Sequence, residues 1–156
     1  MANRSVGGTR SPARVVTLAA VPAAAGWSRS FARETLCRWG IAEHADVVEL
    51  LTSELVTNAV RAARGVEPDR SAWSAAPLVR VWLRLVGDTL LIEAWDPGTA
   101  CPVLSRPTAS AENGRGLQLV DAMSDRWDHY TAWPCGKVVW CAVDVPSPDP
   151  APPELP

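Results

Sequence analysis

Residues 78–95 restrict the fold more than any other stretch, because a run of alternating side chains is followed by a possible turn and a second, largely apolar run. In LVRVWLRLV the two kinds of residue alternate one by one: Val79, Val81, Leu83 and Leu85 against Arg80, Trp82 and Arg84. This period of two is typical of a strand with one buried face. Gly87-Asp88 provides a two-residue turn, and TLLIEAW returns as the partner strand. The sequence therefore predicts an antiparallel hairpin.

The other periodic segments fit around this hairpin. They predict a strand at 14–20, helices at 22–39, 43–63 and 116–124, and a second hairpin from 126–133 and 137–145. The resulting order is β-α-α-β-β-α-β-β. It predicts an α+β fold, a two-layer sandwich whose helices cover one face of a mixed, mostly antiparallel sheet.

The chain has the size and composition of one domain. It contains 156 residues, of which 47% are hydrophobic, enough for one sizeable core. Residues 14–145 are expected to form this domain. Residues 1–13 have few apolar side chains and 146–156 are rich in proline, so both are expected to be disordered tails.

Charge and cysteine content argue against several functions. A formal charge of -2 gives no strong field for nucleic acid or an anionic membrane. No apolar run approaches the ~20 residues of a transmembrane helix, and the first residues lack a signal-peptide core. The four cysteines form no C-x-x-C pair, which argues for reduced thiols in a cytoplasmic protein and against a zinc site.

Two polar residues interrupt the apolar face of the helix predicted at 43–63. Glu54 and Asn58 are four residues apart, so they lie on the same face as Val47 and Leu51. An unpaired carboxylate or amide at such a position is costly. Either the fold satisfies both groups internally, or a ligand does. In the second case the carboxylate can accept a proton, and the amide oxygen can bind a hard cation.

A carboxylate follows the predicted strand at 89–95. Asp96 precedes Pro97 and Gly98, which is also common chemistry for a plain exit from a strand into a turn. The functional interpretation is a partly buried carboxylate that accepts from an amino group, with Gly98 leaving room for a flat ring.

Glycines open the helix predicted at 116–124. In ENGRGLQLVDAM, Gly114 and Gly116 leave N–H groups that suit a phosphate, although a simple glycine-rich helix start is equally consistent. The dinucleotide fingerprint is absent, because Leu119 stands at its third glycine position. Val138 after Gly136-Lys137 likewise excludes a Walker A loop. The long loop at 98–113 is expected to be a mobile lid.

The order of these features is more specific than any one of them. E-x-x-x-N on a helix, a hairpin, D-P-G, a long loop and G-R-G-L opening a helix closely resemble the GHKL (histidine kinase-like) ATPase superfamily. SELVTNAV, WDPG, GRGLQLVDAMSDRW and GKVVW are most similar to the small, single-domain anti-sigma-factor serine/threonine kinases. The resemblance covers residues 14–144 and implies the Bergerat-type ATP-binding fold.

The resemblance also implies roles for the matching residues. Glu54 would be the catalytic general base, and Asn58 would bind the Mg²⁺ that accompanies ATP. Asp96 would accept from the adenine amino group with Gly98 beside the ring. The phosphates would lie on four residues: Gly114, Arg115, Gly116 and Leu117.

Two positions depart from the pattern. Many relatives have His where this chain has Ala62, so a polar contact near the nucleotide is expected to be missing. Many also have Thr in the last strand where this chain has Val138, which cannot give the hydroxyl expected to support the aspartate.

The leading hypothesis is an ATP-dependent protein serine/threonine kinase that phosphorylates a serine of an antagonist protein and sequesters a sigma factor. It predicts ATP, the antagonist and the sigma factor as partners, with a homodimer possible and no direct contact with nucleic acid or membrane. The alternative is a nucleotide-binding interaction module without kinase activity. The catalytic part of a histidine kinase fits less well, because no long dimerisation helix carries an acceptor His; His44 and His129 are expected at the surface or a sheet edge.

Overall fold

The computed structural model describes residues 11–66, 76–102 and 115–146. Its elements are β1 (Ala13–Ala19), α1 (Ala24–Trp39), the 3-10 helix η1 (Ala42–His44), α2 (Ala45–Arg64), β2 (Leu78–Val86), β3 (Thr89–Asp96), α3 (Arg115–Met123), β4 (Arg126–Thr131) and β5 (Lys137–Asp144). The order predicted from the sequence is confirmed. Most residues of the two expected tails, and the expected lid from residue 103 onward, lie outside the described residues.

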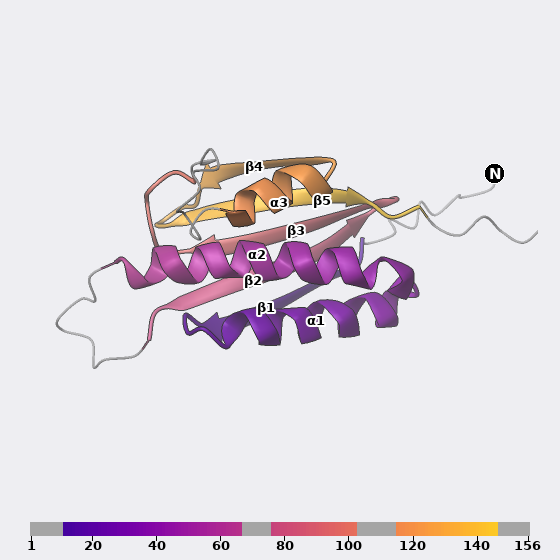
Figure 1. Ribbon diagram of the computed structural model, residues 1–156, viewed down its shortest axis with the longest axis horizontal. Helices are drawn as coiled ribbons and strands as arrows, with labels where there is room; N and C mark the ends of the chain where they lie inside the picture. Colours follow the sequence, from indigo (N-terminus) through magenta and orange to yellow (C-terminus); the bar gives the residue numbers. More distant parts are fainter. Residues whose placement is uncertain (1–10, 67–75, 103–114, 147–156) are drawn as a thin grey trace, which may run out of the picture.

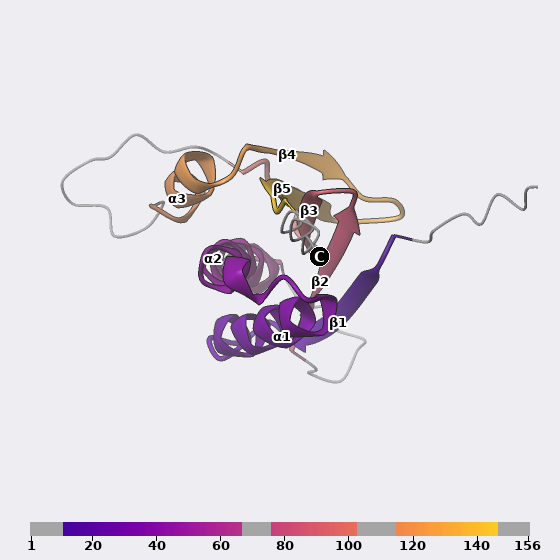
Figure 2. The same cartoon turned by 90° about the vertical axis from the view of Figure 1, so that its right-hand side faces the viewer.

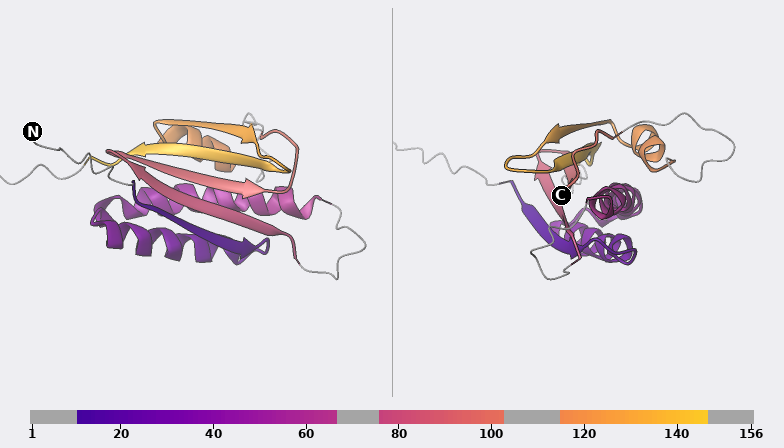
Figure 3. Two further views of the ribbon diagram at one scale, coloured as in Figure 1. Left: turned by 180° about the vertical axis from the view of Figure 1, so that it is seen from behind. Right: turned by 90° about the vertical axis from the view of Figure 1, so that its left-hand side faces the viewer.

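The strands form one five-stranded sheet in the order β1-β2-β3-β5-β4. Every neighbouring pair is antiparallel, so the sheet is not mixed in the part that the structure describes. All three α-helices lie on the same side of the sheet (Figures 1 and 2). The view from behind shows that, in the part of the chain that the structure describes, the other face carries no helix (Figure 3). The predicted α+β two-layer sandwich is confirmed.

Helix α2 is the centre of the helical layer and lies between α1 and α3 (Figure 2). Its apolar side chains recur at the helical period and are buried against the sheet: Val48, Leu51, Leu55, Val56, Ala59, Val60 and Ala63. This apolar face fixes the rotation of α2 about its axis. It thereby fixes the direction of the polar side chains next to the face.

Among the described residues, no helix combines the length and apolar character needed to cross a membrane.

The pairing of β3 with β5 places the site residues. β3 ends at Asp96, directly opposite Lys137 at the start of β5. Along β5, alternate residues face the helices, so Lys137 and Val139 point to the same side. Gly136 precedes Lys137 with φ +85, a conformation that favours glycine. The two central strands therefore deliver a carboxylate and an ammonium to one end of the sheet, on its helical side.

Candidate nucleotide-binding site

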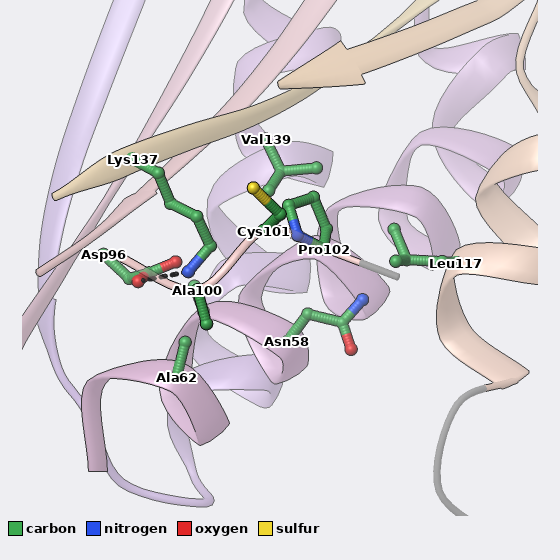
Figure 4. A pocket seen from close by; sticks show the side chains of 10 residues that line it. Asn58, Ala62, Asp96, Ala100, Cys101, Pro102, Leu117, Lys137 and Val139 are labelled. Carbon is green, nitrogen blue, oxygen red and sulfur yellow. Dashed lines mark hydrogen bonds and ion pairs between the residues drawn. The ribbon is translucent and has the colours of Figure 1, made fainter. Parts of the chain in front are cut away.

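A cavity of about 220 Å³ lies where α2, the end of β3, the start of β5 and α3 meet (Figure 4). Most of its lining is apolar, and three polar side chains interrupt it. The lining residues are Asn58, Ala59, Ala62, Asp96, Ala100, Cys101, Pro102, Leu117, Lys137 and Val139. A mostly apolar cavity with a few convergent polar groups is typical of a small-molecule site.

Asp96 lies at the end of this cavity where β3 ends. It is 1% exposed, and its Oδ1 accepts from the Gly98 N–H at 2.8 Å and from Lys137 Nζ at 2.9 Å. Burial raises the pKa of the Asp96 carboxyl, while Lys137 and the Gly98 N–H act in the opposite direction. The result is a buried acceptor beside a buried donor at the edge of a cavity.

Gly98 is held too close to its neighbours for any side chain. A Cβ atom there would lie 2.8 Å from Asp96 Oδ1 and 3.3 Å from both Ala62 Cβ and Lys137 Nζ. The backbone turn after β3 therefore follows the carboxylate closely. The space beside Asp96 stays free of a side chain from this position.

A second cluster of polar side chains lies where the first turn of α3 meets α2. A Cβ at Gly116 would lie 2.6 Å from Glu54 Oε2 and 3.4 Å from Asn58 Nδ2. Glu54 and Asn58 are both half-buried. Asn58 Nδ2 is buried and has no hydrogen-bond partner among the described residues. A buried donor without a partner is costly, so this end of the site is suited to a polar ligand.

The side-chain oxygen atoms of Asn58 and Glu54 also fit a magnesium ion that accompanies phosphates. Within the described ranges, no group of three or more His, Cys, Asp or Glu side chains could hold a metal alone. Mg²⁺ needs few protein ligands when phosphates and water supply the others. The Asn58 amide oxygen, with the Glu54 carboxylate one turn away on α2, provides oxygen atoms of the required kind.

The structure brings most of the predicted site residues together in two groups. Asp96 lines one end of the cavity with Gly98 next to it, and Asn58 lines the other end with Glu54 and Gly116 close by. Two further predicted residues belong to α3. Leu117 lines the cavity, whereas Arg115 is exposed at the helix start. Gly114 lies outside the described residues.

The expectation that position 138 lies where a side chain could support Asp96 is wrong. Val138 lies on the helix-free face of the sheet, in a groove with Trp82 and Trp95, and does not face Asp96. Its neighbour Lys137 supports the carboxylate instead. The error is one residue of strand register, and such a shift moves a side chain to the opposite face. Ala62 does line the cavity, as expected for a position near the ligand.

The motif comparison missed Lys137, Cys101 and Val139. The sequence shows Lys137 only as the first residue of a predicted strand. Recognising it required the cross-strand pair Asp96–Lys137, which a single sequence does not give. Cys101 and Val139 add sulfur and aliphatic surface to the cavity wall (Figure 4).

The comparison with known families agrees with this geometry. The model of the histidine kinase-like ATPase domain matches residues 16–142, which is most of the chain. The protein belongs to this family of ATPase domains. No curated protein matches the sequence.

Proposed function

We propose that the protein binds Mg²⁺-ATP in this cavity and transfers the γ-phosphoryl group to a serine of a small antagonist protein. We further propose that it sequesters a sigma factor in the cytoplasm. The observation that carries the nucleotide site is the pairing of two polar ends across one apolar cavity. Asp96 is an acceptor at one end, and the unpartnered Asn58 amide lies at the other beside Glu54. The motifs SELVTNAV, WDPG and GKVVW support the choice of substrate and partners.

The residues of the cavity have distinct tasks in this proposal. Asp96 accepts from the adenine amino group, and the alanine, proline and valine side chains pack against the ring. Asn58 provides an oxygen for Mg²⁺, and the first N–H groups of α3 face the phosphates. Magnesium, when bound, neutralises the phosphate charge.

Glu54 completes the transfer. Its carboxylate accepts the proton of the serine hydroxyl as the serine oxygen bonds to the γ-phosphorus. The bond between that phosphorus and the bridging oxygen breaks, and ADP leaves with the electron pair. Catalysis would come mainly from position and charge, as in other phosphoryl transfers.

One observation favours the alternative of a nucleotide-binding module without kinase activity. Lys137 already donates to Asp96 Oδ1, so a nucleotide would bind a carboxylate that is already paired with a lysine. If this site binds ATP without aligning it for transfer, sequestration of a partner is the remaining function.

Phosphotransfer from labelled ATP to a panel of candidate antagonist domains separates the two functions. We expect the parent protein to label one antagonist on serine. Glu54→Gln should bind ATP normally but transfer ~100- to ~10,000-fold more slowly, since it lacks the general base. Glu43→Gln, an exposed carboxylate in η1, is the matched control and should behave like the parent.

The possible failures differ in meaning. ATP binding without transfer to any antagonist would favour the interaction module. An unchanged rate in Glu54→Gln would remove that residue from the chemistry. Absence of ATP binding in the parent would contradict both functions.

A further inference from the structure

Lys137 is the unexpected group in this site. It is 6% exposed, it lines the cavity, and its ammonium lies 2.9 Å from Asp96 Oδ1 (Figure 4). A buried ion pair adds little stability compared with apolar side chains of similar size, so its presence in a binding cavity calls for another role.

The donors of Lys137 are not exhausted by this pair. An ammonium has three N–H donors, and Asp96 accepts one of them. Among the described residues, no other side chain or backbone group accepts from Lys137. The remaining donors are therefore available at the edge of the cavity, next to the acceptor that the nucleotide would use.

The order of acceptor and donor matches the pairing edge of adenine. Adenine presents its amino group, a donor, next to ring nitrogen N1, an acceptor. A carboxylate and an ammonium side by side are complementary to that pair, as uracil or thymine is in a base pair. Guanine placed in the same orientation presents a carbonyl oxygen to Asp96 and N1–H to Lys137, so both contacts would be repulsive. The juxtaposition of Asp96 and Lys137 thus carries information about the base.

We propose that Lys137 is a specificity-determining residue whose ammonium donates to N1 of adenine while Asp96 accepts from the amino group. This inference rests on the proposed function, because it assumes that ATP binds with its adenine against Asp96. Ala62, Pro102 and Val139 give this cavity apolar walls. A charge-assisted hydrogen bond in such surroundings is stronger than one exposed to water.

The test crosses two ligands with three proteins in calorimetric titrations. The ligands are ATP and 1-deaza-ATP, in which a C–H group replaces N1. The proteins are the parent, Lys137→Met, which cannot donate, and Lys137→Gln, which keeps a neutral donor. We expect the parent to bind ATP about 10- to 100-fold more tightly than 1-deaza-ATP. Lys137→Met should bind the two ligands within about threefold of each other, and Lys137→Gln should recover part of the difference.

Purine riboside triphosphate, which keeps N1 but lacks the amino group, controls for the Asp96 contact. Its loss of affinity relative to ATP should persist in Lys137→Met, provided urea unfolding shows the variant to be folded. Equal affinity of the parent for ATP and 1-deaza-ATP would overturn the role of Lys137 alone. So would equal discrimination by the parent and Lys137→Met. No binding of ATP by the parent would overturn the proposed function itself.

Discussion

The ion pair between Asp96 and Lys137 concerns stability as well as binding. Both side chains are almost fully buried, and each is the other's charged partner. Removing one member of such a pair leaves an uncompensated charge in a poorly solvated place. Asp96 therefore cannot be changed without a cost to the folded protein.

For this reason we expect Asp96→Asn to lower the free energy of unfolding by about 3–5 kcal/mol at pH 7. The double variant Asp96→Asn/Lys137→Met, which removes both charges, should recover most of that loss. Urea unfolding of the four combinations measures the coupling. An Asp96→Asn protein as stable as the parent would contradict the buried pair. Binding losses of the single variant must be measured where it is fully folded.

For single residues, the sequence already indicated which side chains depart from the apolar and polar pattern of their segment. Glu54 and Asn58 stand inside an apolar helical face, and Asp96 stands between a strand and a glycine. Such positions can be recognised as unusual from the sequence alone, without knowledge of the fold. Lys137 breaks no pattern, because a lysine at the start of a strand is ordinary. Only the register of β3 against β5 turns it toward Asp96.

At the scale of elements, the turn before β5 is held unusually close to β3. Gly136 has φ +85, and a Cβ there would overlap the carbonyl oxygen of Asp96 and lie 2.7 Å from Trp95 Nε1. Gly87, in the β2–β3 turn, has φ +60, but no atom of the described residues lies within 4 Å of a Cβ placed there. Substitutions at the two glycines therefore separate the cost of a positive φ, which both share, from the cost of steric overlap, which only Gly136 adds.

We therefore expect Gly136→Ala to be the more damaging of two matched substitutions. Gly87→Ala should cost about 1–2 kcal/mol for the left-handed backbone alone. Gly136→Ala adds an overlap worth about 1–3 kcal/mol more, and it should also weaken ATP binding, because it displaces the backbone of Asp96. Thermal unfolding and ATP titration of both variants measure these effects. Equal stability losses would show that the turn can move away from β3.

Element types were predictable because the periods of two and 3.6 are visible in the residues themselves. The strand order was not, since nothing within KVVWCAVD states that β5 lies between β3 and β4. Its near-continuous apolar run fits a central strand buried on both faces, but such a run also fits other strand orders. The prediction of a mixed sheet was wrong for the described strands, because β1 with β2 and β3 with β5, which are not neighbours in the sequence, also pair antiparallel.

At the scale of the whole molecule, the four cysteines report on different regions. Cys37, Cys101 and Cys135 are exposed, and Cys141 is buried in β5. Burial raises the pKa of the Cys141 thiol to about 12, so this thiol is expected to be inert in the folded protein. Cys101 lines the cavity (Figure 4), whereas Cys135 lies in the groove on the helix-free face of the sheet.

These cysteines allow ATP binding in the cavity between α2, β3, β5 and α3 to be tested in the native sequence. The measurement is the rate of alkylation of each cysteine by iodoacetamide at increasing Mg²⁺-ATP, followed by peptide mass spectrometry. We expect the rate at Cys101 to fall to a plateau as ATP saturates, while Cys37 and Cys135 keep their rates and Cys141 stays unmodified. A rate at Cys101 that ATP does not change, or one that falls together with the rates at Cys37 and Cys135, would contradict ATP binding in this cavity.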